Sequence, residues 1–172
     1  DMDDFMATVP LQYAIWEMPP ESASSPYTMN AVSHNGGAVH GAKVDGKLIG
    51  FSFAFASRRG DAWMLWSHMA GVHPDYQGQG IGYTLKQVQR KWSLENGYQV
   101  IGWAFDPLQR GHASFNFHRL GTIARTYKPN TYGEMTDGIN AGLASDRLEA
   151  LWLLESAHVV ALAQPDADIT ED

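Results

Sequence analysis

Residues 72–82 read Val72-His73-Pro74-Asp75-Tyr76-Gln77-Gly78-Gln79-Gly80-Ile81-Gly82. Three glycines alternate with other residues at the point where a helix is predicted to begin. The helix is indicated by apolar residues at helical spacing (Ile81, Leu85, Val88 and Trp92) and by Gly97, which fits the position just beyond its end. Backbone N–H groups at a helix N-terminus attract anions, and glycine lets a phosphate approach the main chain closely. The segment therefore predicts an anion site, and the alternative is a tight turn that needs positive φ.

Two other phosphate-binding motifs do not fit this spacing. A dinucleotide-binding motif needs Gly-x-Gly-x-x-Gly directly after a strand, whereas here the glycines alternate and residues 73–76 intervene. An ATPase P-loop requires Gly-Lys followed by Ser or Thr, which is absent. Asp106 follows the next predicted strand, where a ribose-binding acid would lie, but the antiparallel strands upstream argue against that fold.

The segments on either side of this turn predict an α/β fold of the α+β type with a mixed central sheet of about six strands. Upstream, strands are expected at 38–44, 47–57 and 62–72, the first two joined by the hairpin turn Asp45-Gly46. Downstream, a strand at 98–105 should lie parallel to the strand before the helix, which completes a β-α-β unit. Pro10 should kink or split the first helix. The remaining elements are expected as helices at 4–16, from Ser25-Pro26 to Gly36-Gly37 and at 113–120, and as strands at 122–127 and 147–154.

Composition places the chain among soluble globular domains. Its 172 residues suit one domain, expected at 1–164 with an acidic, frayed tail at 165–172. The net charge is −7 and no Lys or Arg precedes Lys43, which argues against a nucleic-acid partner. No apolar run approaches the roughly 20 residues that span a membrane, and the acidic start lacks the positive region of a secretory signal. We therefore expect a cytoplasmic protein without membrane partners.

The segment 72–82 resembles the acyl-CoA motif of the GNAT (GCN5-related N-acetyltransferase) superfamily, with Gln77, Gly80 and Gly82 at its three defining positions. The resemblance implies the GNAT fold, with helices on both faces of the sheet, and acetyl-CoA or another acyl-CoA, succinyl-CoA included, as co-substrate. It implies that the backbone of residues 77–82 holds the CoA pyrophosphate, and that the pantetheine arm lies where strand 62–72 parts from strand 98–105. The implied cofactor-binding residues are Ala70, Gly71, Val72, Gln77, Gly78, Gln79, Gly80, Ile81, Gly82, Tyr83 and Asn116. Because glutamines stand where family members commonly carry arginine, we expect Lys86 and Arg90 to strengthen CoA binding.

Shorter segments are similar to a subgroup of bacterial GNAT proteins, some of them related to amino-acid N-succinyltransferases: Ser67-His68-Met69, residues 103–108, Phe115-Asn116, Leu120-Gly121 and residues 132–138. This similarity implies an N-acyltransferase that acts on the amine of a small molecule such as an amino acid. Two alternatives stay open: a catalytically weak acyl-CoA-binding sensor module, and an acetyltransferase of protein lysines or N-termini. The oligomeric state is also open, a homodimer included.

The chemistry that the resemblance implies is direct attack of an amine on the thioester, because a chain without cysteine cannot form an enzyme thioester. The base is expected to be His68, four residues before Val72, and the alternative is a histidine that only packs within the sheet. Where the family usually offers a tyrosine as acid, this chain has Phe117. In place of that tyrosine, Asn116 or a later tyrosine (Tyr127 or Tyr132) could act on the CoA thiolate that leaves, or water could protonate it. Seven histidines show no metal-ligand spacing, so we expect no metal.

A long irregular segment at 132–147 is the candidate acceptor-binding loop, because such loops in compact domains tend to be functional. Arg147 is expected to pair with a substrate carboxylate, since a guanidinium forms two parallel hydrogen bonds to one. Glu134 and Arg125 are the other expected substrate-binding residues. The alternative is a solvated surface loop in which Arg147 only begins the last strand.

Overall fold

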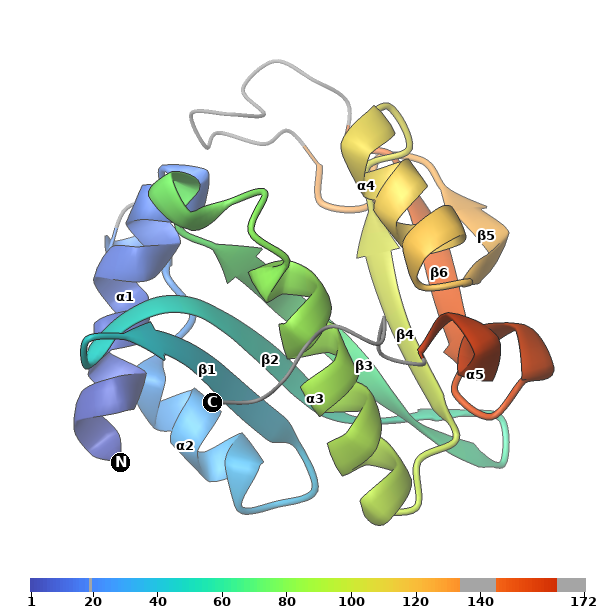
Figure 1. The fold of residues 1–172 in the computed structure, drawn as a ribbon, viewed down its shortest axis with the longest axis horizontal. Coiled ribbons are helices and arrows are strands. Elements are labelled where there is room, and N and C mark those ends of the chain that lie inside the picture. The colour runs from blue at the N-terminus through green and yellow to red at the C-terminus, as the bar shows by residue number, and fades with distance from the viewer. Residues whose placement is uncertain (19, 134–144, 164–172) are drawn as a thin grey trace.

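The computed structural model describes residues 1–18, 20–133 and 145–163. Its principal elements are α1 (Met2–Trp16), α2 (Pro26–Ser33), β1 (Ala38–Val44), β2 (Lys47–Arg59), β3 (Ala62–Val72), α3 (Ile81–Glu95), β4 (Val100–Phe105), α4 (Arg110–Ser114), β5 (Ile123–Lys128), β6 (Arg147–Leu153) and α5 (Ala157–Leu162) (Figure 1). Single 3-10 turns lie at η1 (Pro20–Ser22) and η2 (Pro74–Tyr76), and a π-helical turn, η3 (Phe115–Arg119), continues α4. No helix in the described ranges is long and apolar enough to cross a membrane.

The strands form one six-stranded mixed sheet in the order β1-β2-β3-β4-β6-β5. All neighbouring strands are antiparallel except β3 and β4, which α3 connects as a parallel pair. The β1–β2 hairpin turns at Asp45 and Gly46, whose φ angles of 50° and 78° are the positive values that a two-residue turn needs. The predicted mixed sheet and its β-α-β unit are therefore confirmed.

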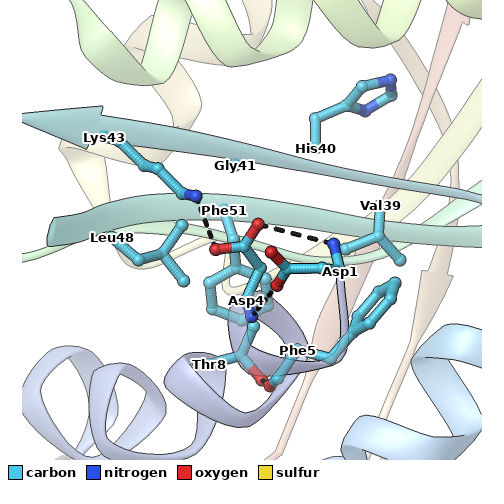
Figure 2. Close-up of a pocket in the computed structure, with 10 residues that line it drawn as sticks. All are labelled: Asp1, Asp4, Phe5, Thr8, Val39, His40, Gly41, Lys43, Leu48 and Phe51. Carbon is cyan, nitrogen blue, oxygen red and sulfur yellow. Dashed lines mark hydrogen bonds and ion pairs between the residues drawn. The ribbon is translucent and has the colours of Figure 1, made fainter. Parts of the chain in front are cut away.

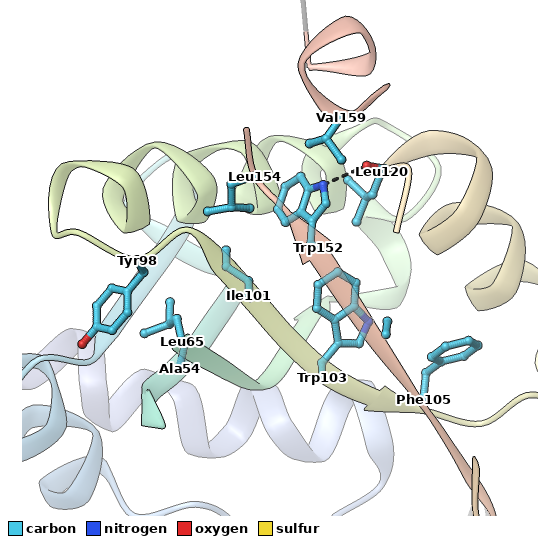
Figure 3. Close-up of a cluster of buried hydrophobic side chains, with 11 residues drawn as sticks. Ala54, Leu65, Tyr98, Ile101, Trp103, Phe105, Leu120, Trp152, Leu154 and Val159 are labelled. Carbon is cyan, nitrogen blue, oxygen red and sulfur yellow. Dashed lines mark hydrogen bonds between the residues drawn. The ribbon is translucent and has the colours of Figure 1, made fainter. Parts of the chain in front are cut away.

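Two hydrophobic clusters lie against the sheet, one with each layer of helices. Leu11 of α1 and Met29 of α2 pack with Phe51 and Phe53 of β2. The second cluster joins β3, β4 and β6 with partly buried side chains of α3, and Trp152 at its centre donates from Nε1 to the carbonyl of Leu120 (2.8 Å; Figure 3). Helices thus cover both faces, as the family resemblance implied.

The face of α3 toward the sheet is more polar than the sequence pattern predicted. Leu85 is buried there, but so are Lys86, Gln89 and Ser93, whereas Val88 is 44% exposed. The helix begins after Gly80 and is followed by Gly97, both with φ near +80°, so the predicted ends of the helix are confirmed.

Three expectations about other elements are corrected. Pro10 does not split α1. Pro10 and Met6, the residue whose carbonyl loses its donor, are both exposed. The helix expected at 113–120 begins at Arg110 and changes to π-helical geometry before Gly121. Helix α5 was not predicted, and it packs His158 against Gly121. The tail expected at 165–172 lies outside the described residues.

Candidate functional site

The central feature of the site is a fork between β3 and β4. The two strands pair only at Leu65–Ile101 and Trp66–Gly102, and then diverge (Figure 1). Beyond these pairs β3 continues to Val72 along β2, and β4 continues to Phe105 along β6. Along the inner edges of the fork, backbone N–H and C=O groups of one strand therefore make no hydrogen bonds to the other strand. An extended chain that carries amides could pair with these groups.

The glycine turn lies at the open end of this fork and leads into α3. Gly78 and Gly80 have φ of 76° and 82°, and a Cβ on either would meet no heavy atom within 4 Å. Gly80 is the N-cap of α3 and offers no side chain, so the first N–H groups of this 15-residue helix have no side-chain cap. Open backbone donors with the helix dipole behind them suit a phosphate group.

The side chains of the turn hold its shape and leave the backbone to bind. Gln77 donates from Nε2 to the carbonyl of Val72 (3.0 Å), and its own N–H donates to Pro74 (3.2 Å). Gln79 donates to the carbonyl of Asp75 (3.4 Å). The N–H of Gln77 is thus already hydrogen-bonded within the turn. The N–H groups that remain to bind a phosphate are those after residue 77. His73 accepts from the N–H of Asp75 through Nδ1 (3.3 Å) and so helps to hold the turn.

His68 lies just beyond the fork apex, at a bulge. Phe53 pairs with Met69 and Ala54 pairs with Ser67, so His68 is the extra residue on β3. A bulge re-aims a side chain and is frequent beside active sites. The imidazole remains exposed, while the rings of Phe53 and Phe55, each with its centroid 5.8 Å away, exclude enough water to lower the pKa of His68 by desolvation. Among the described residues neither ring nitrogen has a hydrogen-bond partner, so the imidazole is available as a base.

Lys86 and Arg90 are not where the sequence led us to expect them. Lys86 is only 5% exposed and donates to Ser67 Oγ (2.8 Å) inside the sheet. Arg90 donates from Nε and Nη2 to the carbonyl of Leu154 at 3.1 and 2.6 Å. The expectation that these cations compensate for the glutamines of the turn is therefore wrong, because helical spacing turns both toward the protein interior.

The expected proton donors lie on different elements. Asn116 is 4% exposed within η3, where its carbonyl accepts from both the N–H and the hydroxyl of Thr122, and its amide has no partner among the described residues. The ring of Phe117 packs edge-on against Phe105 with centroids 5.8 Å apart, so the position of the family's tyrosine is a packing residue here. Tyr127 donates to Asp146, which raises the pKa of that phenol.

Arg147, an expected acceptor-binding residue, and Tyr132, a candidate proton donor, lie together at the open end of the fork. Leu148 of β6 pairs with Phe105, so Arg147 lies just past the end of β4. Its guanidinium carbon is 5.3 Å from the ring centroid of Tyr132, and Nη1 donates to the carbonyl of Asp146 (2.8 Å). Arg125 is exposed and occupies a bulge of β5 between Ala124 and Thr126. Glu134 lies outside the described residues.

The described structure also contains two cavities away from the fork. One of about 180 Å³ lies between α1 and β1, where Figure 2 shows Asp4 bonded to Lys43 and to the amine of Asp1. Another of about 280 Å³ lies between β1 and α3 and reaches Gln79 and Ile81. The first is lined only by α1, β1, β2 and Asp1, so β2 separates it from the fork.

Sequence reasoning missed two features of the site. The bulge at His68 leaves no mark in the residue pattern, since it depends on the register between β2 and β3. The residue pattern offered only a weak sign that Lys86 is buried: Lys86 lies three residues from both Tyr83 and Gln89, and so on the same face of the helix as they do.

Comparison with known proteins agrees with this geometry. A search of curated proteins gave no match. Among solved structures, yncA from Salmonella typhimurium, determined with its cofactor acetyl-CoA, superposes with a TM-score of 0.70 at 19% identity, over 97% of this chain and 95% of that one. The ribosomal-protein-S18-alanine N-acetyltransferase from Escherichia coli gives 0.68 at 17% identity, over 90% of each chain. An N-acetyltransferase from Staphylococcus aureus gives 0.71 at 13% identity, over 90% and 95%.

These superpositions establish a shared fold. The family itself follows from a separate match, in which a model of the acetyltransferase (GNAT) family covers residues 5–122, including the fork, the glycine turn and α3. The chain therefore belongs to the GNAT acetyltransferase family, whose members transfer an acyl group from acyl-CoA to an amine.

Proposed function

We propose that this protein transfers an acetyl or succinyl group from CoA to the amine of a small molecule that carries a carboxylate, such as an amino acid. One observation carries the proposal: an open fork between β3 and β4 that leads from the glycine turn to an exposed imidazole at a bulge. Family membership supplies the reaction class, and the residues around the fork suggest the finer assignment.

The glycine turn and the fork would hold the co-substrate. The backbone around Gly78 and Gly80 and the first N–H groups of α3 would accept the pyrophosphate, since no Cβ or capping side chain occupies that space. The fork-facing backbone of residues 70–72 would hydrogen-bond the amides of the pantetheine arm. When bound, the acyl-CoA supplies a thioester that an amine can attack directly.

His68 would act as the general base. The attacking amine forms the new C–N bond as the C–S bond breaks, and the imidazole takes the proton that the nitrogen loses. Because desolvation holds the pKa of His68 below its usual 6.5, the ring is neutral and able to accept a proton at pH 7. Tyr132 or water would give a proton to the departing thiolate, and Asn116 would stabilise it with a hydrogen bond.

The acceptor carboxylate would bind near Arg147 and Tyr132. A desolvated carboxylate needs a charged or hydrogen-bonding partner, and a guanidinium offers a planar fork that matches it. Arg147 lies beside an aromatic ring, at the end of β4 where the fork is open. Arg125 and Glu134 would contribute further contacts to the same acceptor.

A second candidate function is an acyl-CoA-binding module with weak catalysis. The observation that favours it is Phe117, whose ring packs against Phe105 and has no proton to give the leaving thiolate. Such a module would bind acyl-CoA as tightly as an enzyme does but turn it over slowly.

Steady-state release of free CoA thiol distinguishes these functions. Acetyl-CoA and succinyl-CoA would each be combined with a panel of amino acids, matched amines lacking a carboxylate, and peptides. We expect turnover with at least one amino acid and little with its decarboxylated analogue. Turnover confined to peptides or to amines without a carboxylate would contradict the acceptor assignment, and CoA binding without turnover would favour the sensor.

A further inference from the structure

The fork apex contains a buried ammonium that the proposed chemistry does not use. Ser67 and Trp103 are the first residues beyond the last paired positions of β3 and β4. Lys86 Nζ donates to Ser67 Oγ (2.8 Å) and lies 4.0 Å from the centroid of the Trp103 ring. One side chain of α3 thus contacts both strands at the point where they separate.

The side-chain amide of Gln89 is oriented to accept a hydrogen bond from this ammonium. Gln89 accepts from Lys86 Nζ through Oε1 (3.0 Å), and Gln89 is fully buried. Its Nε2 has no hydrogen-bond partner among the described residues, an arrangement that costs free energy. Burial also lowers the pKa of Lys86 to about 7, so the protein loses stability by keeping a charge here. An apolar residue of similar volume would fill this position at no such cost.

On the opposite face of the apex, Met64 and Trp66 pack over Gly102. A Cβ on Gly102 would lie 2.4 Å from Met64 Cε and 3.2 Å from the ring of Trp66, so glycine allows these side chains to cross the strand. Beyond the paired residues β3 keeps its ladder to β2, and β4 keeps its ladder to β6. Trp103 also packs edge-on against Trp152, with centroids 6.1 Å apart. Across the fork, Lys86 contacts both Ser67 and Trp103.

We propose that Lys86 is a positioning residue, which fixes where β3 and β4 separate and so aims the bulge that carries His68. Ser67 directly precedes His68 on β3, and the hydrogen bond from Lys86 holds its side chain on the face opposite the phenylalanines that flank the imidazole. On β4 the same ammonium contacts the face of the Trp103 ring. The ammonium thus connects the helix that begins at the glycine turn to both edges of the fork.

Lys86→Met tests this proposal, with Lys91→Met as the matched control because Lys91 is exposed on the same helix. Both variants should fold, and the thermal midpoint of Lys86→Met should equal or exceed that of the wild type, because a desolvated charge is removed. Hydrogen exchange of peptides covering 66–72 and 102–106 should accelerate about tenfold or more in Lys86→Met alone, because the two strands lose the side chain that links them across the fork.

The transfer reaction gives the second measurement, and this part rests on the proposed function. A displaced base should lower kcat by about tenfold to a hundredfold while the acceptor KM changes little. Ser67→Ala should reproduce the loss, and the double variant should be no slower than Lys86→Met, since both remove one interaction.

The outcomes separate the two proposals. Unchanged exchange at the fork, or unchanged kcat in a folded Lys86→Met protein, would show that Lys86 is only a core residue. A wild-type protein that turns over no acyl-CoA would overturn the proposed function, and the exchange comparison would still decide whether Lys86 restrains the fork.

Discussion

Gly80→Asp is the sharpest test of the glycine turn, because its side chain would enter the space assigned to the CoA pyrophosphate. Among the described residues no heavy atom lies within 4 Å of a Cβ at this position, so the added Cβ meets open space. The φ of 82° costs a non-glycine residue about 1–2 kcal/mol. A carboxylate at the N-terminus of α3 regains about 0.3–1 kcal/mol from the helix dipole. We therefore expect a folded protein with slightly reduced stability.

The effect on CoA binding follows from charge. Two unit charges about 4 Å apart repel by about 4 kcal/mol at an effective dielectric constant near 20, and solvent exposure of the turn reduces this to about 2 kcal/mol. The Kd for CoA should then rise about 30-fold. Gly80→Asn carries the same backbone strain without the charge, so it should weaken binding much less.

Titration calorimetry with CoA measures this change, and thermal unfolding confirms that each variant is folded. Gly97→Asp is the control for strain and charge together, because Gly97 has a φ of 80° and equally open space at the other end of α3, about 22 Å away. Its Kd should equal that of the wild type. A folded Gly80→Asp protein whose Kd lies within about threefold of the wild-type value would show that the pyrophosphate does not bind at this turn.

Substitutions at His68, Arg147 and Glu149 test the rest of the site and its surroundings. His68→Ala should lower kcat about 100-fold with the Kd for CoA nearly unchanged, and an unaltered kcat would show that His68 is only a packing residue. In the wild type, the acid limb of the pH profile of kcat should lie below pH 6.5, because the lowered pKa of His68 keeps the base neutral to lower pH. Arg147→Lys and Arg147→Ala should both raise the acceptor KM and leave the acyl-CoA KM unchanged, and an unaffected acceptor KM would return Arg147 to a strand-end role. Burial raises the pKa of Glu149, but the hydrogen bonds from Lys128 and Arg59 outweigh it and lower the pKa below 4.5. The resulting stabilisation is present above pH 4.5 and is lost as the pH falls through the folded-state pKa. The thermal midpoint of the wild type should therefore drop more steeply with acid than that of Glu149→Gln, and parallel curves would contradict this.

Local sequence alone predicted the β1–β2 hairpin, the open N-terminus of α3 and the parallel pairing of β3 with β4. Asp45-Gly46 requires a hairpin because both positions take positive φ, and β1 spans the strand predicted before it. Alternating glycines before an amphipathic helix require an open helix N-terminus, and Gly80 provides it. The parallel relation of β3 and β4 follows from the single helix that connects them, since a crossover helix returns the chain in the same direction.

The fork and its apex could be decided only by tertiary structure. The register between β2 and β3 makes His68 the bulged residue, and register depends on which side chains both sheet faces can bury. Lys86 resembles a surface cation in the sequence, because its burial depends on partners 17 and 19 residues away, Trp103 and Ser67. Residues distant in the chain meet there only after the sheet has formed. Helical periodicity therefore predicted α3 and the burial of Leu85, but not the burial of Lys86 and Gln89 beside it.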